Sequence, residues 1–463
     1  MPEDPVAVIG AGPAGYPCAI RLSQLGKKVA IIEKDEVGGE CLNFGCIPSK
    51  TIIQAADLCY RYNAFTEKGI FLSGKGSVDM EKLQEFKEGV VRRLTKGVQS
   101  LLNSYGASTI RGNCRFVSGN ELEIDGYGRL KFSSAVIATG SVFSPLPSAQ
   151  FDHVNILDAR DFLSIRKIPA SLLVVGGGYI GMELGIAAAK MGSRVTVVEV
   201  LDSIMSGTDN EILRVVEKRL GKFAITVYTG SAVQSVSKTK EGVSVSVRDA
   251  GGKDFTLKAE KVLVSIGKKS SAGSLGLEHA GVKTDGKGFV PVDEQCRTNA
   301  ANIYAIGDVT GPPFLAHRAT AMGRIAAEVI AGRPSAMDQK VMPTALFTDP
   351  EIASTGMSPA DAEKAGISAR SVRFPYAASG RALSLGESEG FVRLVVAGDG
   401  TVLGCQIVGM DASELISEVS LAIEMGATAE DIAMTVHPHP TLPEMIMEAS
   451  ELAEKKPTNI YQK

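Results

Sequence analysis

The chain contains one unit twice: an apolar strand, then G-x-G-x-x-G, a helical stretch, a second β-branched strand and a glutamate. The first copy reads VAVIGAGPAGYPCAIRLSQLGKKVAIIE over residues 6–33, and the second reads LLVVGGGYIGMELGIAAAKMGSRVTVVE over residues 172–199. All motif positions recur at a constant offset of 166 residues. Because this unit begins a parallel sheet with helices on its faces, the repeat predicts two α/β nucleotide-binding folds in one chain.

Each part of the unit has a physical task in binding a dinucleotide. The first glycine makes the tight strand-to-helix turn, the second lets the backbone approach a pyrophosphate, and the third lets the helix pack on the strand. The predicted binding residues are therefore Gly10, Gly12, Gly15 and Glu33 in the first fold, and Gly176, Gly178, Gly181 and Glu199 in the second. The glutamates are placed to accept hydrogen bonds from an adenosine ribose.

The second site is predicted to prefer NAD over NADP. A carboxylate at the end of the second strand repels a 2′-phosphate, and no arginine stands in the residues directly after Glu199. Two dinucleotide sites in one chain imply that one nucleotide is bound permanently while the other is exchanged.

Composition limits the remaining possibilities. The 463 residues are too many for one hydrophobic core, so several domains are expected. A formal net charge of −3 argues against binding to nucleic acid or to an anionic membrane surface. The sequence shows neither a secretory signal nor an apolar run of about 20 residues that would span a bilayer. A cytoplasmic protein is expected.

Further elements are predicted outside the repeat. Residues 79–104 have a helical pattern, and residues 133–141 and 301–310 each read as a strand that runs into a turn. Asp308 follows the second of these strands, at the edge where open α/β sheets bind ligands. After about residue 341 the strand-like and helical runs continue without a glycine motif, which predicts an α+β domain that supplies subunit contacts.

Two clusters point to redox or acid–base chemistry. Cys41 and Cys46 lie in GGECLNFGCIPSK, and a close pair of thiols in a reducing compartment indicates either a metal site or redox catalysis. Near the end, HPHPTLPE holds His439 and Glu444. A histidine whose second nitrogen is held by a carboxylate is a general base suited to neutral pH.

Taken together, GGECLNFGCIPSK, GGGYIGMELG, AIGDVT with FLAH, and HPHPTLPE resemble the flavoprotein disulfide reductases, the pyridine nucleotide–disulfide oxidoreductases. Among these the chain most resembles the dihydrolipoamide dehydrogenases, over essentially its whole length. The resemblance implies tightly bound FAD in the first fold and exchangeable NAD in the second. It also implies a homodimer, and lipoyl-bearing partners from 2-oxoacid dehydrogenase complexes or the glycine cleavage system.

The resemblance divides the chain into four segments. Residues 1–145 would begin the FAD-binding domain, residues 146–268 would form the NAD-binding domain, residues 269–340 would return to the FAD-binding domain, and residues 341–463 would form the interface domain.

The resemblance also assigns roles to residues of this chain. Cys41 would be the thiol that meets the substrate, Cys46 the thiol beside the flavin, and Lys50 would lie by the flavin ring, paired with Glu183. His439, oriented by Glu444, would be the base and would reach the disulfide of the other subunit. Further contacts to FAD are implied for Gly112, Thr139, Gly140, Ser141, Asp308, Phe314, Leu315, Ala316 and His317, and a contact to NAD for Gly267.

A disulfide between Cys41 and Cys46 would close a very small loop, so the segment is expected to be distorted, with the help of Gly45. A zinc site would need two more ligands at suitable spacing, and none is near in sequence, so no metal is expected. The expected cycle moves two electrons from an external dithiol through the disulfide and FAD to NAD⁺.

The chain departs from the usual pattern of the family at Glu40, Phe44, Lys268, Pro438 and Pro443. Glu40 is expected to raise the pKa of the neighbouring Cys41 thiol.

Alternative interpretations are a glutathione-type or mercuric-type reductase and a non-catalytic flavoprotein redox sensor. The first prefers NADPH, the second carries a further C-terminal cysteine pair, and a sensor would not need the His439 base.

Overall fold

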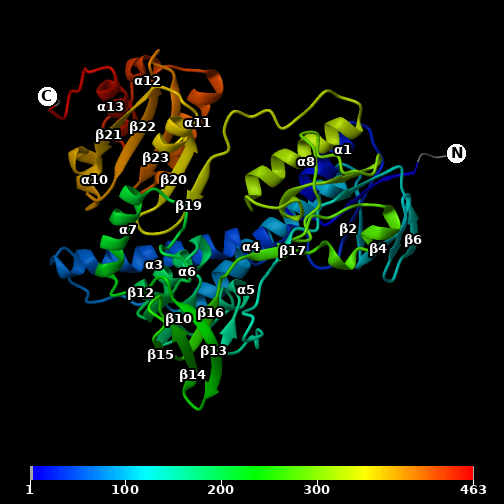
Figure 1. Ribbon diagram of the computed structural model, residues 1–463, viewed down its shortest axis with the longest axis horizontal. Helices are drawn as coiled ribbons and strands as arrows, with labels where there is room; N and C mark the ends of the chain where they lie inside the picture. The colour runs from blue at the N-terminus through cyan, green and yellow to red at the C-terminus, as the bar shows by residue number, and fades with distance from the viewer. Residues whose placement is uncertain (1–3, 462–463) are drawn as a thin grey trace.

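A computed structural model describes residues 4–461, and the first nucleotide fold is built on a five-stranded parallel sheet. Its strand order is β18 (Ile303–Ala305), β7 (Ser134–Ile137), β1 (Val6–Ile9), β2 (Val29–Glu33) and β3 (Ser108–Arg111). The runs VAVI and VAIIE are buried throughout, because helices and loops cover both faces of a parallel sheet. The helices α1 (Gly15–Gln24) and α8 (Ala316–Ile330) lie side by side on one face (Figure 1).

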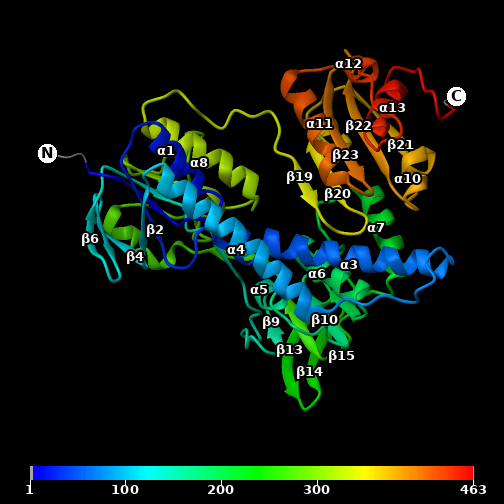
Figure 2. The same ribbon diagram turned by 180° about the vertical axis from the view of Figure 1, so that it is seen from behind.

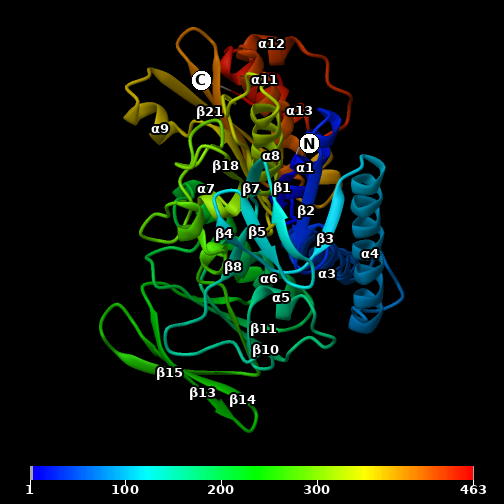
Figure 3. The ribbon, with the colours of Figure 1, turned by 90° about the vertical axis from the view of Figure 1, so that its right-hand side faces the viewer.

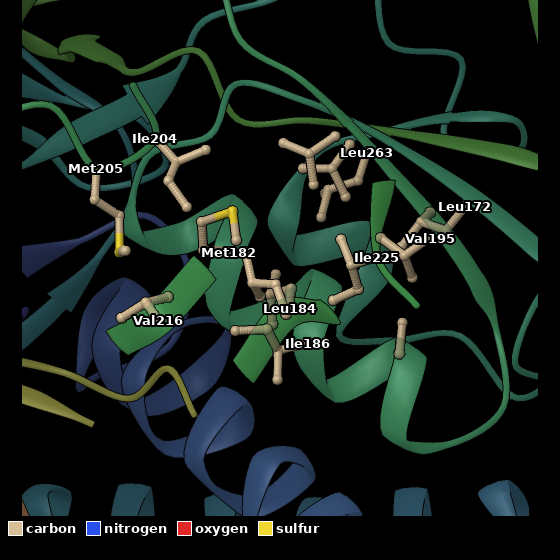
Figure 4. Close-up of a cluster of buried hydrophobic side chains, with 14 of the residues drawn as sticks. Leu172, Met182, Leu184, Ile186, Val195, Ile204, Met205, Val216, Ile225 and Leu263 are labelled. Carbon is tan, nitrogen blue, oxygen red and sulfur yellow. The ribbon is translucent and has the colours of Figure 1, made fainter. Parts of the chain in front are cut away.

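The second fold repeats this plan. Its parallel sheet has the order β12 (Thr226–Tyr228), β11 (Arg194–Val198), β10 (Ser171–Val175), β16 (Lys261–Val264) and β9 (Ile156–Leu157). The helices α6 (Tyr179–Lys190) and α7 (Asn210–Lys222) belong to this fold, and side chains such as Met182, Leu184 and Val216 form its core (Figure 4). The predicted pair of α/β folds is confirmed.

Smaller antiparallel sheets flank the two folds. One sheet consists of β4 (Cys114–Ser118), β5 (Glu121–Ile124) and β6 (Gly128–Lys131), and another of β13 (Ala232–Thr239), β14 (Gly242–Arg248) and β15 (Asp254–Ala259). The strand β17 (Lys268–Ser270), which leaves the second fold, pairs with β8 (Ser141–Phe143), which follows β7 of the first fold. This short ladder joins the two folds beside the carboxyl end of β7.

The region after residue 341 forms the predicted α+β unit. Its antiparallel sheet has the order β19 (Thr344–Leu346), β20 (Ile352–Gly356), β23 (Val402–Val408), β22 (Phe391–Ala397) and β21 (Ala369–Pro375). Its helices are α9 (Pro359–Lys364), α10 (Gly380–Ser384), α11 (Ala412–Met425), α12 (Ala429–Met434) and α13 (Glu444–Ala453). Figure 1 shows this unit beside α7, joined to α8 by a long connection.

Two long helices connect the parts. The helix α3 (Cys46–Glu67) packs against α6 of the second fold, and α4 (Met80–Ser104) crosses α3 and reaches β3 of the first fold (Figures 2 and 3). The helix predicted over residues 79–104 is thus confirmed, with Asp79 as its N-cap: the Asp79 side chain accepts a hydrogen bond from the Lys82 N–H. Within residues 4–461, no helix is long and apolar enough to cross a membrane.

A buried ion network fastens the C-terminal unit to the second fold. Lys190 at the end of α6 pairs with Asp57 of α3 and with Asp349, and its side chain is 3 % exposed. Arg219 of α7 donates from Nε to Asp349 Oδ1 (2.9 Å) and lies 3.2 Å from Glu387 Oε1. Because both cations are buried, loss of either would leave carboxylates without a counter-charge in a medium of low polarity.

We predict that Arg219→Met lowers the free energy of unfolding by about 3 kcal/mol or more, since Asp349 and Glu387 would lose their shared partner. Lys218→Met is the matched control, because Lys218 is 70 % exposed and its pair with Glu389 should contribute less than about 1 kcal/mol. Urea denaturation followed by circular dichroism measures both values. Equal losses in the two variants would contradict a structural role for the buried network.

Candidate active site

The cysteine segment is a helix interrupted by one turn. The helix α2 (Gly39–Asn43) carries Cys41, and α3 begins at Cys46. Between them Phe44 and Gly45 leave the helical region, with φ and ψ of −128° and −108° at Gly45. The predicted distortion is therefore present, and it sets Cys46 at the start of a new helix rather than one turn along the old one.

Two glycines dock this segment onto the loop of the first fold. The Gly38 N–H donates to the Ala11 carbonyl (2.8 Å). Gly39 has a φ of +57°, and a Cβ at this position would lie 2.6 Å from the Cα of Gly12. Only glycine meets both requirements, the left-handed backbone and the close approach. The segment of the two cysteines is thereby fixed against the loop that is predicted to hold a pyrophosphate.

As thiols, Cys41 and Cys46 lie close enough to hydrogen-bond to each other. This bond, followed by burial, raises the pKa of Cys41. The same bond lowers the pKa of Cys46 against the opposing effect of burial, and the Lys50 charge lowers it further. Cys46 is therefore the thiol that ionises first.

The expected effect of Glu40 on Cys41 is not what the structure shows. The causes that raise the pKa of Cys41 are the hydrogen bond to Cys46, burial and the Cys46 charge, whereas the Glu40 charge acts to raise the pKa of Cys46. Sequence adjacency suggested the wrong thiol, because α2 turns the Glu40 side chain towards Lys268.

Lys50 and Glu183 form an ion pair across the two folds. Lys50 Nζ donates to Glu183 Oε2 (2.8 Å), and the Glu183 side chain is 5 % exposed. Glu183 Oε1 accepts from the Phe347 N–H (2.8 Å), and Lys50 lies over the Phe347 ring at 4.4 Å. The pair thus joins the cysteine helix α3, α6 of the second fold and the C-terminal unit.

A cavity of about 610 Å³ links both folds to the thiols. The predicted site residues that line it are Gly10, Gly12, Glu33, Cys41, Cys46, Lys50, Gly112, Thr139, Gly140, Ser141, Glu183, Asp308, Phe314 and Ala316. The predicted residues that do not line it are Gly15, Leu315, His317, Gly176, Gly178, Gly181, Glu199, Gly267, His439 and Glu444. Leu315 caps α8, and the exposed His317 ring contacts the Pro343 carbonyl through Nε2 (2.8 Å).

The walls of the cavity suit a dinucleotide. A Cβ on Gly10 would lie 2.4 Å from the Ala138 carbonyl oxygen and one on Gly15 would lie 1.8 Å from the Gly10 oxygen, so these glycines serve packing. At Gly12 no atom other than the Gly39 Cα lies within 4 Å of such a Cβ, which leaves this backbone open to a ligand. The Thr139 hydroxyl lines the cavity and is buried without a hydrogen-bond partner. Such an orphan polar atom fits a bound FAD.

Glu33 and Glu199 are held by matching hydrogen bonds. Glu33 accepts from the Ala11 and Asp35 N–H groups (2.7 and 2.9 Å), and Glu199 accepts from the Gly177 and Leu201 N–H groups (2.6 and 2.8 Å). A carboxylate has about four acceptor positions, so each glutamate keeps capacity for ribose hydroxyls. A Cβ on Gly178 would meet nothing within 4 Å, so the second loop is open, as exchange of NAD requires.

Asp308 lies at the carboxyl end of β18, as predicted, in η3 (Gly307–Thr310). It accepts a hydrogen bond from the Ser141 hydroxyl (2.6 Å), and Lys268 Nζ lies 3.9 Å from its Oδ2. The Ser271 hydroxyl donates to the carbonyls of Thr139 (2.7 Å) and Gly140 (2.9 Å) and fixes their turn. These contacts hold the ends of β7 and β18 of the first fold together beside the cavity.

Sequence reasoning missed several residues of the cavity wall. Tyr179 and Ile180 line it from within the second glycine motif, and their position between Gly178 and Gly181 could have indicated this. Arg160 of α5 (Ala159–Phe162) covers the Phe44 ring at 3.6 Å, and no local pattern points to that contact. The same holds for Lys268, which pairs with Glu40 at a separation of 228 residues.

His439 and Glu444 form the predicted pair. His439 Nδ1 lies 2.8 Å from Glu444 Oε1, and the ring is 79 % exposed. Burial alone would raise the pKa of Glu444, but the Thr441 N–H and the His439 ring outweigh it and lower that pKa. The ring is thus oriented by a carboxylate and presents Nε2 outward, away from the cavity of its own chain.

No metal-binding group accompanies the two thiols. In residues 4–461, no cluster of three or more histidine, cysteine or acidic side chains is arranged to hold a metal ion. The two thiols can exchange a disulfide, and the His439–Glu444 pair can accept a proton.

Comparison with known proteins gives consistent matches over the whole chain. Residues 4–323 match the model of the pyridine nucleotide-disulphide oxidoreductases, and residues 342–450 match the dimerisation domain of these proteins. The dihydrolipoyl dehydrogenase of Geobacillus stearothermophilus is 43 % identical over 465 residues, covering 100 % of this chain and 98 % of the relative. Dihydrolipoyl dehydrogenase 2 of Haloarcula marismortui is 44 % identical over 96 % of both chains.

Two solved structures have the same fold. LpdA from Mycobacterium tuberculosis superposes with a TM-score of 0.90 at 27 % identity, covering 97 % of this chain and 99 % of that chain. The HOCl-induced flavoprotein disulfide reductase RclA from Escherichia coli superposes with a TM-score of 0.87 at 25 % identity, with the same coverage.

We predict that Gly39→Ala strips the protein of FAD, because a methyl group would push the cysteine segment away from Gly12. Gly26→Ala is the matched control: its φ is +77°, but a Cβ there meets nothing within 4 Å. The ratio of flavin absorbance to protein absorbance after gel filtration measures how much FAD is retained. Gly39→Ala should lose at least about half of its FAD, because a contact this close costs more than about 1 kcal/mol. Gly26→Ala should lose none. Equal retention in both variants would contradict the docking contact.

Proposed function

Because this chain belongs to the pyridine nucleotide-disulphide oxidoreductase family, we propose that its cysteine pair and two nucleotide folds form one electron relay. The chain is an enzyme that oxidises dihydrolipoyl groups and reduces NAD⁺, with FAD as its second cofactor, as its relatives at 42–44 % identity indicate. The glutathione-type, mercuric-type and non-catalytic alternatives are not favoured.

One observation carries this function: a single cavity runs from Glu33 past the two thiols to Tyr179 at the start of α6. Glu33 marks the ribose end of the first nucleotide site, and Tyr179 lies within the glycine motif of the second. A group bound in the first fold would therefore lie between the thiols and the second nucleotide.

The thiol chemistry is a two-electron exchange. One thiolate of the substrate attacks the Cys41 sulfur of the Cys41–Cys46 disulfide, which forms a mixed disulfide and releases Cys46 as a thiolate. The second substrate thiol then displaces Cys41, so the substrate leaves as a disulfide and the enzyme holds a dithiol. His439 takes the proton that the substrate thiol loses in the first step.

Cys46 is suited to the inner position. Its pKa is lowered by the hydrogen bond from Cys41 and by the Lys50 charge, which favours the thiolate at this position. When bound, FAD supplies the two-electron chemistry that connects such a dithiol with a nicotinamide. Lys50, held by Glu183, places a positive charge beside this centre, and Asp308, Thr139 and Ser141 supply polar contacts along the first nucleotide.

The chain acts as a homodimer, consistent with its C-terminal dimerisation domain. His439 is exposed and lies outside the cavity of its own chain, while its partner Glu444 orients it. We infer that it serves the disulfide of the partner subunit. A complete site then needs two chains.

We infer the partner proteins, the compartment and the preferred nucleotide from this proposed function. The dihydrolipoyl group arrives on a protein of a 2-oxoacid dehydrogenase complex or of the glycine cleavage system, and the reaction takes place in the cytoplasm. The open loop at Gly178 and the Glu199 carboxylate support exchange of NAD rather than NADP at the second site.

We predict rapid NADH formation from dihydrolipoamide and NAD⁺, and far slower turnover with NADP⁺. Cys41→Ser should reduce kcat by about a thousandfold or more, because the mixed disulfide cannot form. Cys59→Ser is the control and should keep full turnover, since Cys59 lies outside the cavity. Absorbance at 340 nm measures the rates. Turnover with other disulfides but not with dihydrolipoamide would sink the assigned substrate and keep the relay.

A second prediction concerns the shared site. Cys41→Ser and His439→Gln homodimers should each be inactive, yet a one-to-one mixture refolded or expressed together should regain about one quarter of the wild-type activity. Half of the dimers would then be mixed, each with one complete site. The steady-state rate of the mixture measures this. Activity no higher than the sum of the two parents would show that His439 acts within its own chain or has no role.

A further inference from the structure

The Glu40–Lys268 contact joins the cysteine segment to the strand that leaves the second fold. Lys268 Nζ donates to Glu40 Oε1 at 2.5 Å, and its side chain is 8 % exposed. The ammonium also lies 3.9 Å from Asp308 Oδ2 and 4.9 Å from the centre of the Phe143 ring. One buried cation therefore serves two carboxylates that line the cavity.

The backbone around Lys268 is fixed. Lys268 pairs with Phe143 in the ladder between β17 and β8, and the Ser144 N–H donates to the Gly267 carbonyl (3.1 Å). Glu40 in turn belongs to the α2 turn that Gly38 and Gly39 dock onto the first fold. The ion pair thus links two segments, the β17–β8 ladder and the α2 turn, that backbone hydrogen bonds already hold in place.

The Glu40 charge acts on the reduced centre, and Lys268 acts on Glu40. Burial raises the pKa of Glu40 above its ordinary value, and the charge and hydrogen bond of Lys268 offset part of this rise. The Glu40 charge raises the pKa of Cys46, opposite to the effect of Lys50. The charged and titratable groups around Cys46 are Cys41, Lys50 and Glu40, with Tyr179, Asp308 and Glu183 nearby.

We propose that Glu40 and Lys268 are a positioning pair for the disulfide chemistry: they hold the Cys41 turn against the strand leaving the second fold, and the balance of their charges tunes the reactivity of Cys46. The inference rests on the proposed redox role of Cys46.

The test follows alkylation of Cys46 in the FAD-loaded protein. In a Cys41→Ser background, Cys46 is the only thiol left in the cysteine segment. Peptide mapping after iodoacetamide treatment gives its rate at each pH, and the midpoint of that profile reports the thiolate. The variants are Glu40→Gln, Lys268→Met, their combination and Lys268→Arg, with Lys269→Met as the matched control because Lys269 is exposed on the same strand.

The two single variants should shift the midpoint in opposite directions. Glu40→Gln removes the acid and leaves the cation, so the midpoint falls and alkylation near pH 7 rises roughly threefold. Lys268→Met leaves Glu40 and Asp308 without their cation, so the midpoint rises and alkylation slows by roughly the same factor. The combination should lie between them, and Lys268→Arg and Lys269→Met should match the parent.

A shift of both single variants in the same direction, or of neither, would overturn the proposal. Cys18 and Cys405 are fully buried, so their alkylation identifies any variant that misfolds. If Lys268→Met misfolds, Glu40→Gln decides alone, and an unchanged or raised midpoint rejects the charge balance. The assay uses neither dihydrolipoamide nor NAD⁺, so failure of the proposed substrate leaves it unaffected.

Discussion

The close approach of Gly39 to Gly12 is the constraint on which the rest of the site depends. Two stretches of backbone lie so near each other that a single Cβ would reach within 2.6 Å of the opposite Cα. This contact sets the start of α2, and the break at Gly45 then sets where Cys46 enters α3. The contact with the nucleotide loop therefore determines where the two thiols lie. The chemistry at the sulfur atoms depends in turn on the nucleotide that this loop is predicted to bind.

The contact between Gly39 and Gly12 distinguishes the first nucleotide fold from the second, which it otherwise resembles. Glu33 and Glu199 accept equivalent backbone hydrogen bonds, and Gly10 and Gly176 both turn against a carbonyl of the neighbouring strand end. In the first loop, however, the cysteine segment approaches Gly12, whereas a Cβ on Gly178 in the second loop would meet nothing within 4 Å. The two loops therefore differ in whether the cysteine segment packs against them.

Local and periodic features were predictable from the sequence. The repeated glycine unit, the strand ends at residues 139–141 and 308, the helix of residues 79–104 and the break near Gly45 each follow from patterns within a short window. Contacts between distant segments were not. Glu40 finds Lys268 and Arg219 finds Asp349 only after the folds have packed, and no periodicity encodes such pairs. The cofactor contact of His317 stays a prediction: its ring contacts the Pro343 carbonyl and does not line the cavity.

Two ion pairs flank the thiols. The cysteine segment contributes the cation to one pair and the anion to the other. In the cysteine segment Lys50 is the cation and Glu40 the anion, whereas Glu183 in the second fold is the anion and Lys268 on the departing strand the cation. Each ion pair joins the cysteine segment to a residue of the second fold or of the strand that leaves it. The contact between the two folds is therefore stabilised on both sides of the sulfur atoms. The Lys50 charge lowers the pKa of Cys46 and the Glu40 charge raises it, so the two pairs act on that sulfur in opposite directions. The contact between the folds and the ionisation of Cys46 therefore depend on the same two ion pairs.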